Sequence, residues 1–284
     1  MVRDSFAIFI LSHGRADRMV TVNTILKEGY TGKWYIILDT DDEQYDLYVS
    51  NFGKEHIILF DKKDIKKEFD IMDNFEGDNV PTFARNAVNR IAKNMGLEYF
   101  LELEDDYYKL CFRCEMDNHL PELPIENLDL VIEAMLDFLD KTGLKTVAFA
   151  QAGEMIGGKN GIIWKTRIRR KVMNTFFFRV DNTFDFLGRF NDDVNAYITY
   201  GKTGDVMLQI ANITLDQPVT QQRKGGISEA YKSFGTYVKS FYSVMLRPDC
   251  VKIAVMGRTD RRIHHKIDWK YCVPVIISDR FRKE

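Results

Sequence analysis

The most constraining feature of this 284-residue chain is the stretch from Pro81 to Tyr107. Pro81 suits a first helical turn, and apolar residues recur behind it at helical spacing. Gly96 is suited to end that helix, because glycine tolerates the left-handed backbone of a C-cap. An apolar run then begins at Tyr99 and leads directly into a row of acids. The stretch therefore predicts a helix, a tight exit and a buried strand with carboxylates where the strand ends.

Three of these acids, Glu102, Glu104 and Asp106, are spaced two residues apart. Side chains alternate along a strand, so the three carboxylates share one face. They repel one another unless a cation or hydrogen-bond donors gather there, and hard oxygen ligands of this kind suit Mg²⁺ or Mn²⁺. The alternative is an acidic, solvated turn after a strand. The metal interpretation is favoured because the acids interrupt the apolar strand instead of following it.

Further apolar runs alternate with helical stretches along the chain and favour an α/β fold with a mostly parallel sheet. The predicted elements, in chain order, are strand 6–11, helix 17–28, strand 34–38, strand 56–60, a polar and mobile segment 61–79, helix 127–142 and strand 147–150. Ligands bind at the carboxyl ends of the strands in such sheets.

Polar clusters follow three of these strands. They are His13-Gly14-Arg15, Asp39-Thr40-Asp41-Asp42 and Glu104-Asp105-Asp106. Their coincidence at one edge of the sheet predicts a nucleotide-diphosphate site, because Arg binds phosphate with two parallel hydrogen bonds. Two alternatives remain open: Gly14 makes only a turn with Arg15 in solvent, or Asp39 only caps a following helix.

Composition excludes some classes of protein. The formal net charge of −2 gives no overall attraction to nucleic acid or membranes, so any such surface is a local patch. No apolar run reaches the roughly 20 residues of a membrane span, and the N-terminal run lacks a cleavage site, so a cytoplasmic protein is expected. Cys111 and Cys114 form a Cys-x-x-Cys pair, for which packed thiols are favoured over a zinc site.

Two features of the second half carry chemistry. Residues 165–171 place five basic side chains in seven, beside Trp164 and the aromatic run 176–178, which suits phosphates and exposed bases or else a solvated face. Further on, Asp192 and Asp193 open a predicted helix, where acids either cap the helix or face a substrate. His264 and His265 form the only adjacent histidine pair.

The stretch from Pro81 to Tyr107 resembles the donor-binding core of GT-A glycosyltransferases. The resemblance rests on Ala84-Arg85-Asn86, Gly96-Leu97-Glu98-Tyr99 and the metal motif Glu104-Asp105-Asp106, where Glu104 replaces the usual Asp. The blocks FNDDVNAY (190–197), RKGG (223–226), GTYVKSFYSVM (235–245) and RIHHKIDW (262–269) resemble the TET-associated glycosyltransferase family. That family occurs in bacteriophages and is associated with modification of hydroxymethylated pyrimidines in DNA.

The resemblance implies a single GT-A domain over residues 1–284, Rossmann-like, with a C-terminal acceptor-side extension. Residues 1–115 would bind the nucleotide sugar and residues 116–284 the acceptor. It further implies a metal-dependent transfer, with Mn²⁺ or Mg²⁺ and a UDP-sugar, onto 5-hydroxymethylcytosine in phage DNA, within the host cytoplasm. A protein, lipid or polysaccharide acceptor is one alternative, and a catalytically silent module that binds DNA or protein is another.

The resemblance also assigns the site residues. Asp193 is the predicted general base, with Asp192 second. The predicted metal ligands are Glu104, Asp106 and either His264 or His265. The predicted donor contacts are His13, Arg15, Asp39, Asp41, Arg85, Glu104 and Asp105. The basic runs of the sequence supply the predicted DNA contacts, Lys165, Arg167, Arg169, Arg170, Lys171, Arg223 and Lys224; for the last two, a flexible lid over the donor is an equal alternative. Reaching a base within a duplex requires flipping it out, and the aromatic residues near Phe176 or Tyr242 are the stacking candidates, with core packing as the alternative.

Overall fold

The computed structural model describes residues 2–75, 79–155, 157–166, 168–169, 172–218, 235, 237–256 and 261–272. The helices are α1 (Thr21–Lys27), α2 (Tyr45–Phe52), α3 (Lys62–Ile65), α4 (Pro81–Asn94), α5 (Leu128–Thr142), α6 (Ile162–Thr166), α7 (Asp192–Tyr200) and α9 (Val238–Leu246). Short 3₁₀ turns are η1 (Lys54–His56), η2 (Ala152–Glu154), η3 (Gly158–Asn160), η4 (Val180–Asn182), η5 (Gly201–Thr203) and η6 (Trp269–Tyr271).

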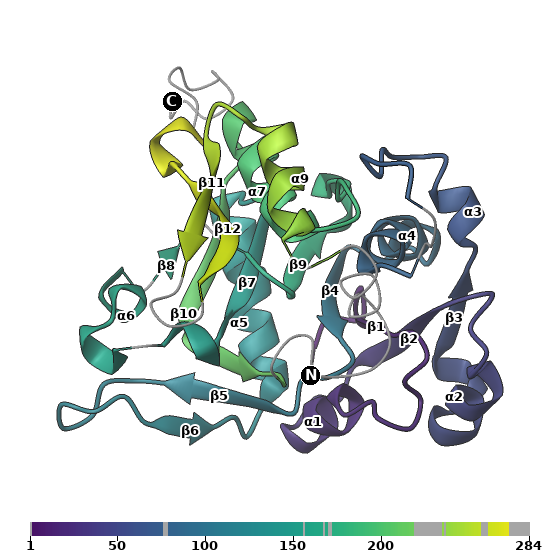
Figure 1. The fold of residues 1–284 in the computed structure, drawn as a ribbon. Coiled ribbons are helices and arrows are strands. Elements are labelled where there is room, and N and C mark those ends of the chain that lie inside the picture. Colours follow the sequence, from purple (N-terminus) through teal and green to yellow (C-terminus); the bar gives the residue numbers. More distant parts are fainter. Residues whose placement is uncertain are drawn as a thin grey trace.

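Ten strands of the described residues form one mixed sheet in the order β3-β2-β1-β4-β9-β7-β10-β5-β6, with β8 paired to β10 (Figure 1). They are β1 (Phe6–Leu11), β2 (Lys33–Asp39), β3 (Ile57–Phe60), β4 (Tyr99–Glu104), β5 (Lys109–Arg113), β6 (Glu122–Pro124), β7 (Thr146–Gln151), β8 (Ile168–Arg169), β9 (Phe176–Arg179) and β10 (Met207–Asp216). A separate antiparallel pair joins β11 (Val251–Met256) to β12 (Arg262–Ile267). The predicted α/β class with a mostly parallel sheet is confirmed.

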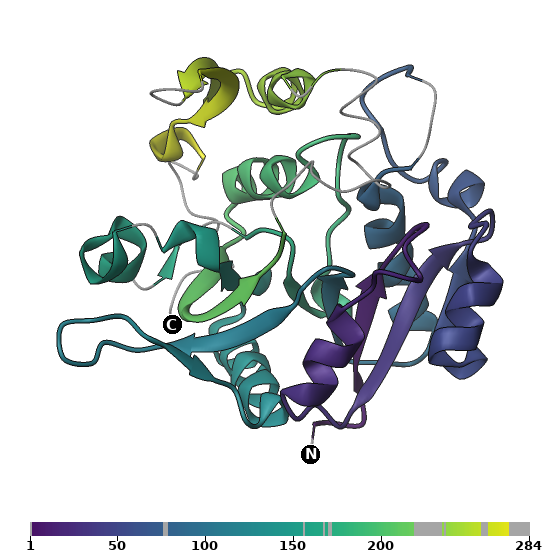
Figure 2. The ribbon, with the colours of Figure 1, turned by 60° about the horizontal axis from the view of Figure 1, so that its bottom comes forward.

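The two faces of the main sheet carry separate apolar cores. The core on one face includes Ile8 and Ile10 of β1 and is covered by α1, α2 and α5. The core on the other face includes Phe9 and is covered by α3, α4 and α7. Alternate residues of one strand thus enter opposite cores, which is why β1 is apolar throughout. Outside α7, the β11–β12 pair and α9 form a further layer (Figure 2).

The strand β9 explains how the two halves of the chain become one sheet. It runs antiparallel to β4 on one side and to β7 on the other. Its three phenylalanines, residues 176–178, are fully buried. Core packing, the alternative to base stacking for Phe176, is therefore its role in this structure. Tyr242 is buried as well, at 2% exposed, whereas the nearby Tyr237 and Phe241 are 53% and 43% exposed.

Two predicted elements differ from the structure. The first helix begins at Thr21 and not near residue 17, because Gly14 and Arg15 donate backbone hydrogen bonds to Asp42 and Tyr48 and are held in a loop. The segment predicted to be polar and mobile is partly buried within its described residues 61–75. It contains α3 and two buried isoleucines, and Asp73 within it pairs with the buried Arg189.

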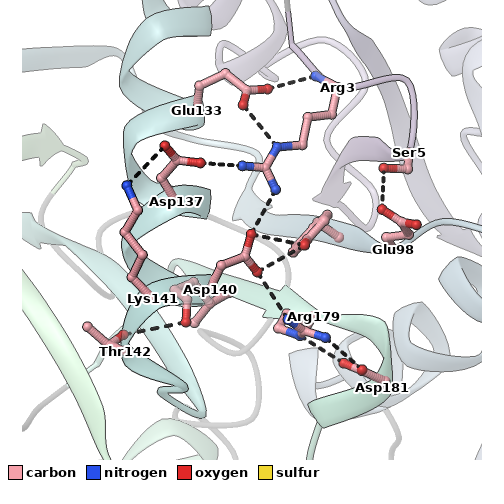
Figure 3. Close-up of polar contacts among 12 residues, drawn as sticks. Arg3, Ser5, Glu98, Glu133, Asp137, Asp140, Lys141, Thr142, Arg179 and Asp181 are labelled. Carbon is pink, nitrogen blue, oxygen red and sulfur yellow. Dashed lines mark hydrogen bonds and ion pairs between the residues drawn. The ribbon is translucent and has the colours of Figure 1, made fainter.

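An ion-pair network fixes the N-terminus against α5 (Figure 3). Arg3 contacts Glu133, Asp137 and Asp140 at 3.0, 2.5 and 2.9 Å. Asp140 also accepts hydrogen bonds from Tyr99 at 2.9 Å and Arg179 at 3.1 Å. Burial alone would raise the pKa of Asp140, but its hydrogen bonds with Arg3 and Tyr99 lower it. Arg3, Tyr99 of β4 and Arg179 of β9 thus all contact side chains of α5.

Candidate functional site

The carboxyl ends of β1, β2 and β4 are level with one another at one edge of the sheet. In the parallel register, Leu11 of β1 pairs with Glu104 of β4 and with Ile37 of β2. The loops that follow these strands therefore leave the sheet side by side. As predicted, this brings together the polar clusters at residues 13–15, 39–42 and 104–106.

Arg85 is the centre of the site. It projects from α4 with its side chain 2% exposed, and it contacts three carboxylates. The distances are 3.4 Å to Glu102, 2.9 Å to Glu104 and 2.9 Å to Asp192 at the start of α7. The guanidinium also lies over the rings of Phe176 and Phe186, at 4.9 and 5.3 Å from their centroids. Arg85 thus joins the acids at the end of β4 to an acid from the second half of the chain.

Among the described residues, the acids of the site outnumber the arginines that contact them. Here five carboxylates contact two guanidinium groups, those of Arg15 and Arg85; the acids are Glu102, Glu104, Asp105, Asp106 and Asp192. Burial raises the pKa of Glu102 and of Glu104 to about 8 each, although the Arg85 charge opposes the increase. One oxygen of Glu102, Oε1, is buried with no hydrogen-bond partner among the described residues.

These carboxylate groups fit a divalent cation electrostatically. All the charged ligands are carboxylate oxygens, which Mg²⁺ and Mn²⁺ prefer, and Glu104 keeps 29% of its side chain exposed. The fit is not that of a preformed cage, because no three side chains of the His, Cys, Asp and Glu types group as a metal-binding set within the described residues. Oxygens from a bound ligand would have to complete the coordination, as is usual for Mg²⁺ beside phosphates.

The loop after β1 is fixed to the acidic motif. Asp105 accepts hydrogen bonds from Ser12 at 2.6 Å and from Arg15 at 2.9 Å, and it is 3% exposed. Arg15 also lies 4.0 Å from Asp106. Its backbone amide donates to the hydroxyl of Tyr48, which bonds Ser12 as well. Arg15 is therefore held toward the acids and away from bulk solvent, with 16% of its side chain exposed.

The other predicted donor contacts lie around the second strand. Asp39 is buried and forms an ion pair with Lys62 of α3, which also donates to Asn79. His13 lies 3.3 Å from Asp42, and the hydrogen bonds that Asp42 accepts from His13, Gln44 and Gly14 lower its pKa against the effect of burial. Asp41, by contrast, is exposed.

The start of α7 is held by the outer layer. Asn191 precedes the helix in the left-handed region, at φ 55° and ψ 35°, which asparagine tolerates. Its side-chain amide donates to the Lys239 carbonyl at 2.8 Å and the Ser243 hydroxyl at 3.3 Å, and it lies 3.1 Å from Nδ1 of His265.

The two acids of α7 differ in their environment. Asp192 is 7% exposed and directed to Arg85. Asp193 is partly exposed, and its carboxylate accepts from the amide of Val194 at 2.7 Å. His265 therefore connects to the acidic cluster through Asn191 and the neighbouring Asp192.

Most of the predicted DNA-contacting segment lies outside the described residues. Arg167, Arg170, Lys171, Arg223 and Lys224 are not described, and of Arg169 only its backbone, in β8, is. Lys165 is exposed at the end of α6.

Three site residues escaped sequence reasoning: Asn191, Lys62 and Tyr48. In the sequence, an asparagine before a helix, a lysine after a strand and a tyrosine within a helix are all ordinary. Only the sheet order shows that they face this site.

The mixed sheet with carboxylates at the end of β4 defines a GT-A glycosyltransferase fold. The mannosyltransferase PcManGT from Pyrobaculum calidifontis, solved with GDP-Man and Mn²⁺, has a similar fold, with a TM-score of 0.51, 10% identity and coverage of 86% of this chain and 65% of that chain. Lower TM-scores of 0.45 relate the chain to Staphylococcus aureus TarS 1–349 (10% identity, 86% and 65% covered) and to glucosyl-3-phosphoglycerate synthase from Mycobacterium tuberculosis (9% identity, 92% and 86% covered).

The chain spans 65% of the length of the first two of these structures. No curated protein matches its sequence. A family model of the TET-associated glycosyltransferases, however, matches residues 6–226, and the chain belongs to this family. The predicted family is thereby confirmed. The outer layer formed by α9, β11 and β12 lies beyond the matched residues.

Proposed function

We propose that the protein transfers a sugar from a nucleotide-diphosphate donor, a UDP-sugar, to the hydroxymethyl oxygen of 5-hydroxymethylcytosine in phage DNA, in the host cytoplasm. The observation that carries this proposal is the junction at Arg85, where the acids of β4 meet the acids of α7. Family membership supports the chemistry and the DNA acceptor. No helix in the described part of the chain is long and apolar enough to cross a membrane.

In this proposal the first half of the chain, residues 1–115, binds the donor. Arg15 contacts the diphosphate, since it is fixed by Asp105 at 2.9 Å and reaches toward Asp106. Asp39, on the neighbouring strand, binds the base after exchanging its ion pair with Lys62 for a hydrogen bond to the ligand. Glu104 and Asp106 would hold Mn²⁺ or Mg²⁺, with His265 as the further ligand. The cation would neutralise charge on the departing diphosphate.

The second half, residues 116–284, handles the acceptor. The hydroxymethyl group must lose its proton as the new glycosidic bond forms, and a positioned carboxylate can accept it. Asp193 is the proposed base, because it is partly exposed whereas the carboxylate of Asp192 is directed to Arg85. Asp192 positions the helix start through its ion pair with Arg85. The bond from the sugar to the diphosphate breaks, and the proton leaves on Asp193.

The test is incubation of hydroxymethylcytosine DNA with a panel of nucleotide sugars, followed by mass spectrometry of the nucleosides. We expect a sugar adduct that requires Mn²⁺ or Mg²⁺, disappears in a chelator and is absent from DNA with plain cytosine. Asp193→Asn should reduce kcat by about 100-fold or more with little change in donor KM, because a general base acts only in the transition state.

The matched control is Asp192→Asn, which keeps the neighbouring position and changes the same chemical group. It should reduce stability as well as kcat, because it breaks the contact with Arg85. A normal rate in Asp193→Asn would assign the base to another residue. Transfer to a protein, lipid or polysaccharide, with none to DNA, would overturn the acceptor.

A further inference from the structure

A basic surface on the outer layer has no place in the donor chemistry described above. Residues 250–272 contain six Lys and Arg residues and two Asp residues, a formal excess of four positive charges in a chain of net charge −2. The described part of this segment forms β11, β12 and η6, which we call the C-terminal ribbon. It lies beyond residue 226, where the family match ends.

Two lysines of the ribbon face each other across the strands. Lys252 of β11 and Lys266 of β12 are direct partners in the antiparallel register, so their side chains share one face. Both are exposed, and neither has an ion pair or hydrogen bond to its side chain within the described residues. Like charges placed directly opposite destabilise a strand pair, so this face favours an anion.

The opposite face of the ribbon is apolar and only partly used for packing. Val251 pairs with Ile267, and both belong to the same core as Val244 of α9. Ile253 and Val255, which lie on this same face, are 38% and 67% exposed. A membrane surface would require basic and apolar side chains on one face, whereas here they separate to opposite faces. The segregation favours a phosphate backbone.

Aromatic side chains follow the ribbon strands in the chain. Trp269 and Tyr271 of η6 are 40% and 51% exposed, and the ammonium of Lys270 lies 4.6 Å from the centre of the Tyr271 ring. Trp269 stacks on Tyr197 of α7 at 5.4 Å. Basic groups interleaved with exposed rings suit nucleic acid, in which phosphates alternate with bases.

The ribbon is also tied to the acceptor side of the site. His265 of β12 contacts Asn191 at 3.1 Å, and the next residue, Asp192, contacts Arg85 at 2.9 Å. Figure 1 shows β11 and β12 beside α9 and α7. His265 and Lys266 alternate along β12, so the lysine face lies opposite this contact, and the ribbon would hold a polyanion on its outward side.

We propose that the C-terminal ribbon binds the phosphate backbone of the acceptor DNA duplex through Lys252 and Lys266. This inference rests on the proposed DNA acceptor. A two-stranded antiparallel ribbon is narrow enough for the major groove of B-DNA, about 12 Å wide, so its lysine face can reach the phosphates at the groove edges.

The experiment measures binding of a labelled duplex containing 5-hydroxymethylcytosine by fluorescence anisotropy over a range of salt concentrations. The variant is Lys252→Gln with Lys266→Gln, and the matched control is Lys54→Gln with Lys93→Gln. The control lysines are exposed and follow α2 and end α4, away from the carboxyl edge of the sheet. Each phosphate contact contributes about −0.9 to the slope of log K against log salt.

We expect the ribbon variant to flatten this slope by about 1.8 and to bind about 10- to 60-fold more weakly at 0.1 M salt, with the control unchanged. Donor KM should not change in either variant, which separates this effect from damage to the site. An unchanged slope, with wild-type transfer intact, would overturn the ribbon assignment and leave the proposed function standing.

Other outcomes separate the two proposals further. Ribbon-dependent DNA binding without any sugar transfer would support the ribbon and overturn the acceptor chemistry. Absence of DNA binding by the wild type would overturn both.

Exposed lysines also protect strand edges from aggregation. If the ribbon variant aggregates yet its monomer binds DNA with the wild-type slope, that protective role accounts for the lysines and the proposal fails. Lysine-dependent binding to anionic phospholipid vesicles without binding to DNA would likewise overturn it.

Discussion

Replacing Arg85 with Met tests whether the candidate site is held together as the contacts indicate. Methionine keeps an unbranched apolar side chain but leaves Glu102, Glu104 and Asp192 without their common cation. Removing one partner of a buried ion pair destabilises a protein by about 3–5 kcal/mol, because the groups left behind stay buried without their hydrogen-bond partner. Glu102 is the most enclosed of the three partners, since it is fully buried.

The expected decrease in the free energy of unfolding is therefore about 3–5 kcal/mol. In chains of comparable size each kcal/mol lost from the free energy of unfolding lowers Tm by about 2–4 °C. The expected decrease in Tm is therefore about 6–20 °C. The measurement is chemical denaturation followed by circular dichroism, together with a thermal scan, both in the presence of a chelator so that no added metal compensates for the lost charge.

Arg90→Met is the matched control on the same helix. Arg90 pairs with Glu68 at 2.7 Å, but both side chains are about half exposed, at 43% and 50%. Such pairs contribute about 0–1 kcal/mol. Adding Glu102→Gln to Arg85→Met should recover part of the loss, with a coupling of at least about 1 kcal/mol between the two sites. A loss in Arg85→Met no larger than in Arg90→Met would refute this account of the site.

Two further predictions concern other parts of the structure. Asn191→Gly keeps the left-handed backbone but removes three amide contacts, so we expect a lower kcat for transfer with donor KM unchanged; Asn191→Ala, strained at φ 55° by about 1–2 kcal/mol, should have the lower Tm of the two. Asp140→Asn removes a carboxylate whose pKa lies below its usual value of 3.8 in the folded state. Its stabilising effect is present above that pH and is lost as the pH falls, so thermal scans should show a Tm difference of a few degrees at pH 7 that disappears toward pH 3.

Much of the donor half could be predicted from the sequence because its signals are local. The strand Phe6–Leu11 has the predicted bounds, and α4 begins at Pro81 as predicted. The polar clusters meet because parallel strands end at one edge. The start of α1 was predicted four residues early, since the hydrogen bonds that hold Gly14 and Arg15 in a loop come from residues on and before α2.

The partners of the site residues could not be predicted in the same way. Arg85 and Asp192 are 107 positions apart, and they meet only because β9 inserts between β4 and β7. The same insertion buries Phe176, whose sequence context is equally typical of an exposed stacking ring. Local periodicity gives the elements, but the order of strands in the sheet decides which side chains share a site.

The strand order also bears on how the two proposed binding regions relate. Because β9, from the second half of the chain, is paired on both sides within the main sheet, the donor half and the α7 acids belong to one core and cannot separate without breaking it. The ribbon is different, since it pairs only with itself and meets the site through α9 and Asn191. Substitutions on the outward face of the ribbon can therefore change how the acceptor is held without disturbing Arg85. For this reason variants of Lys252 and Lys266 should alter DNA affinity, whereas variants of Arg85 should alter stability and chemistry together.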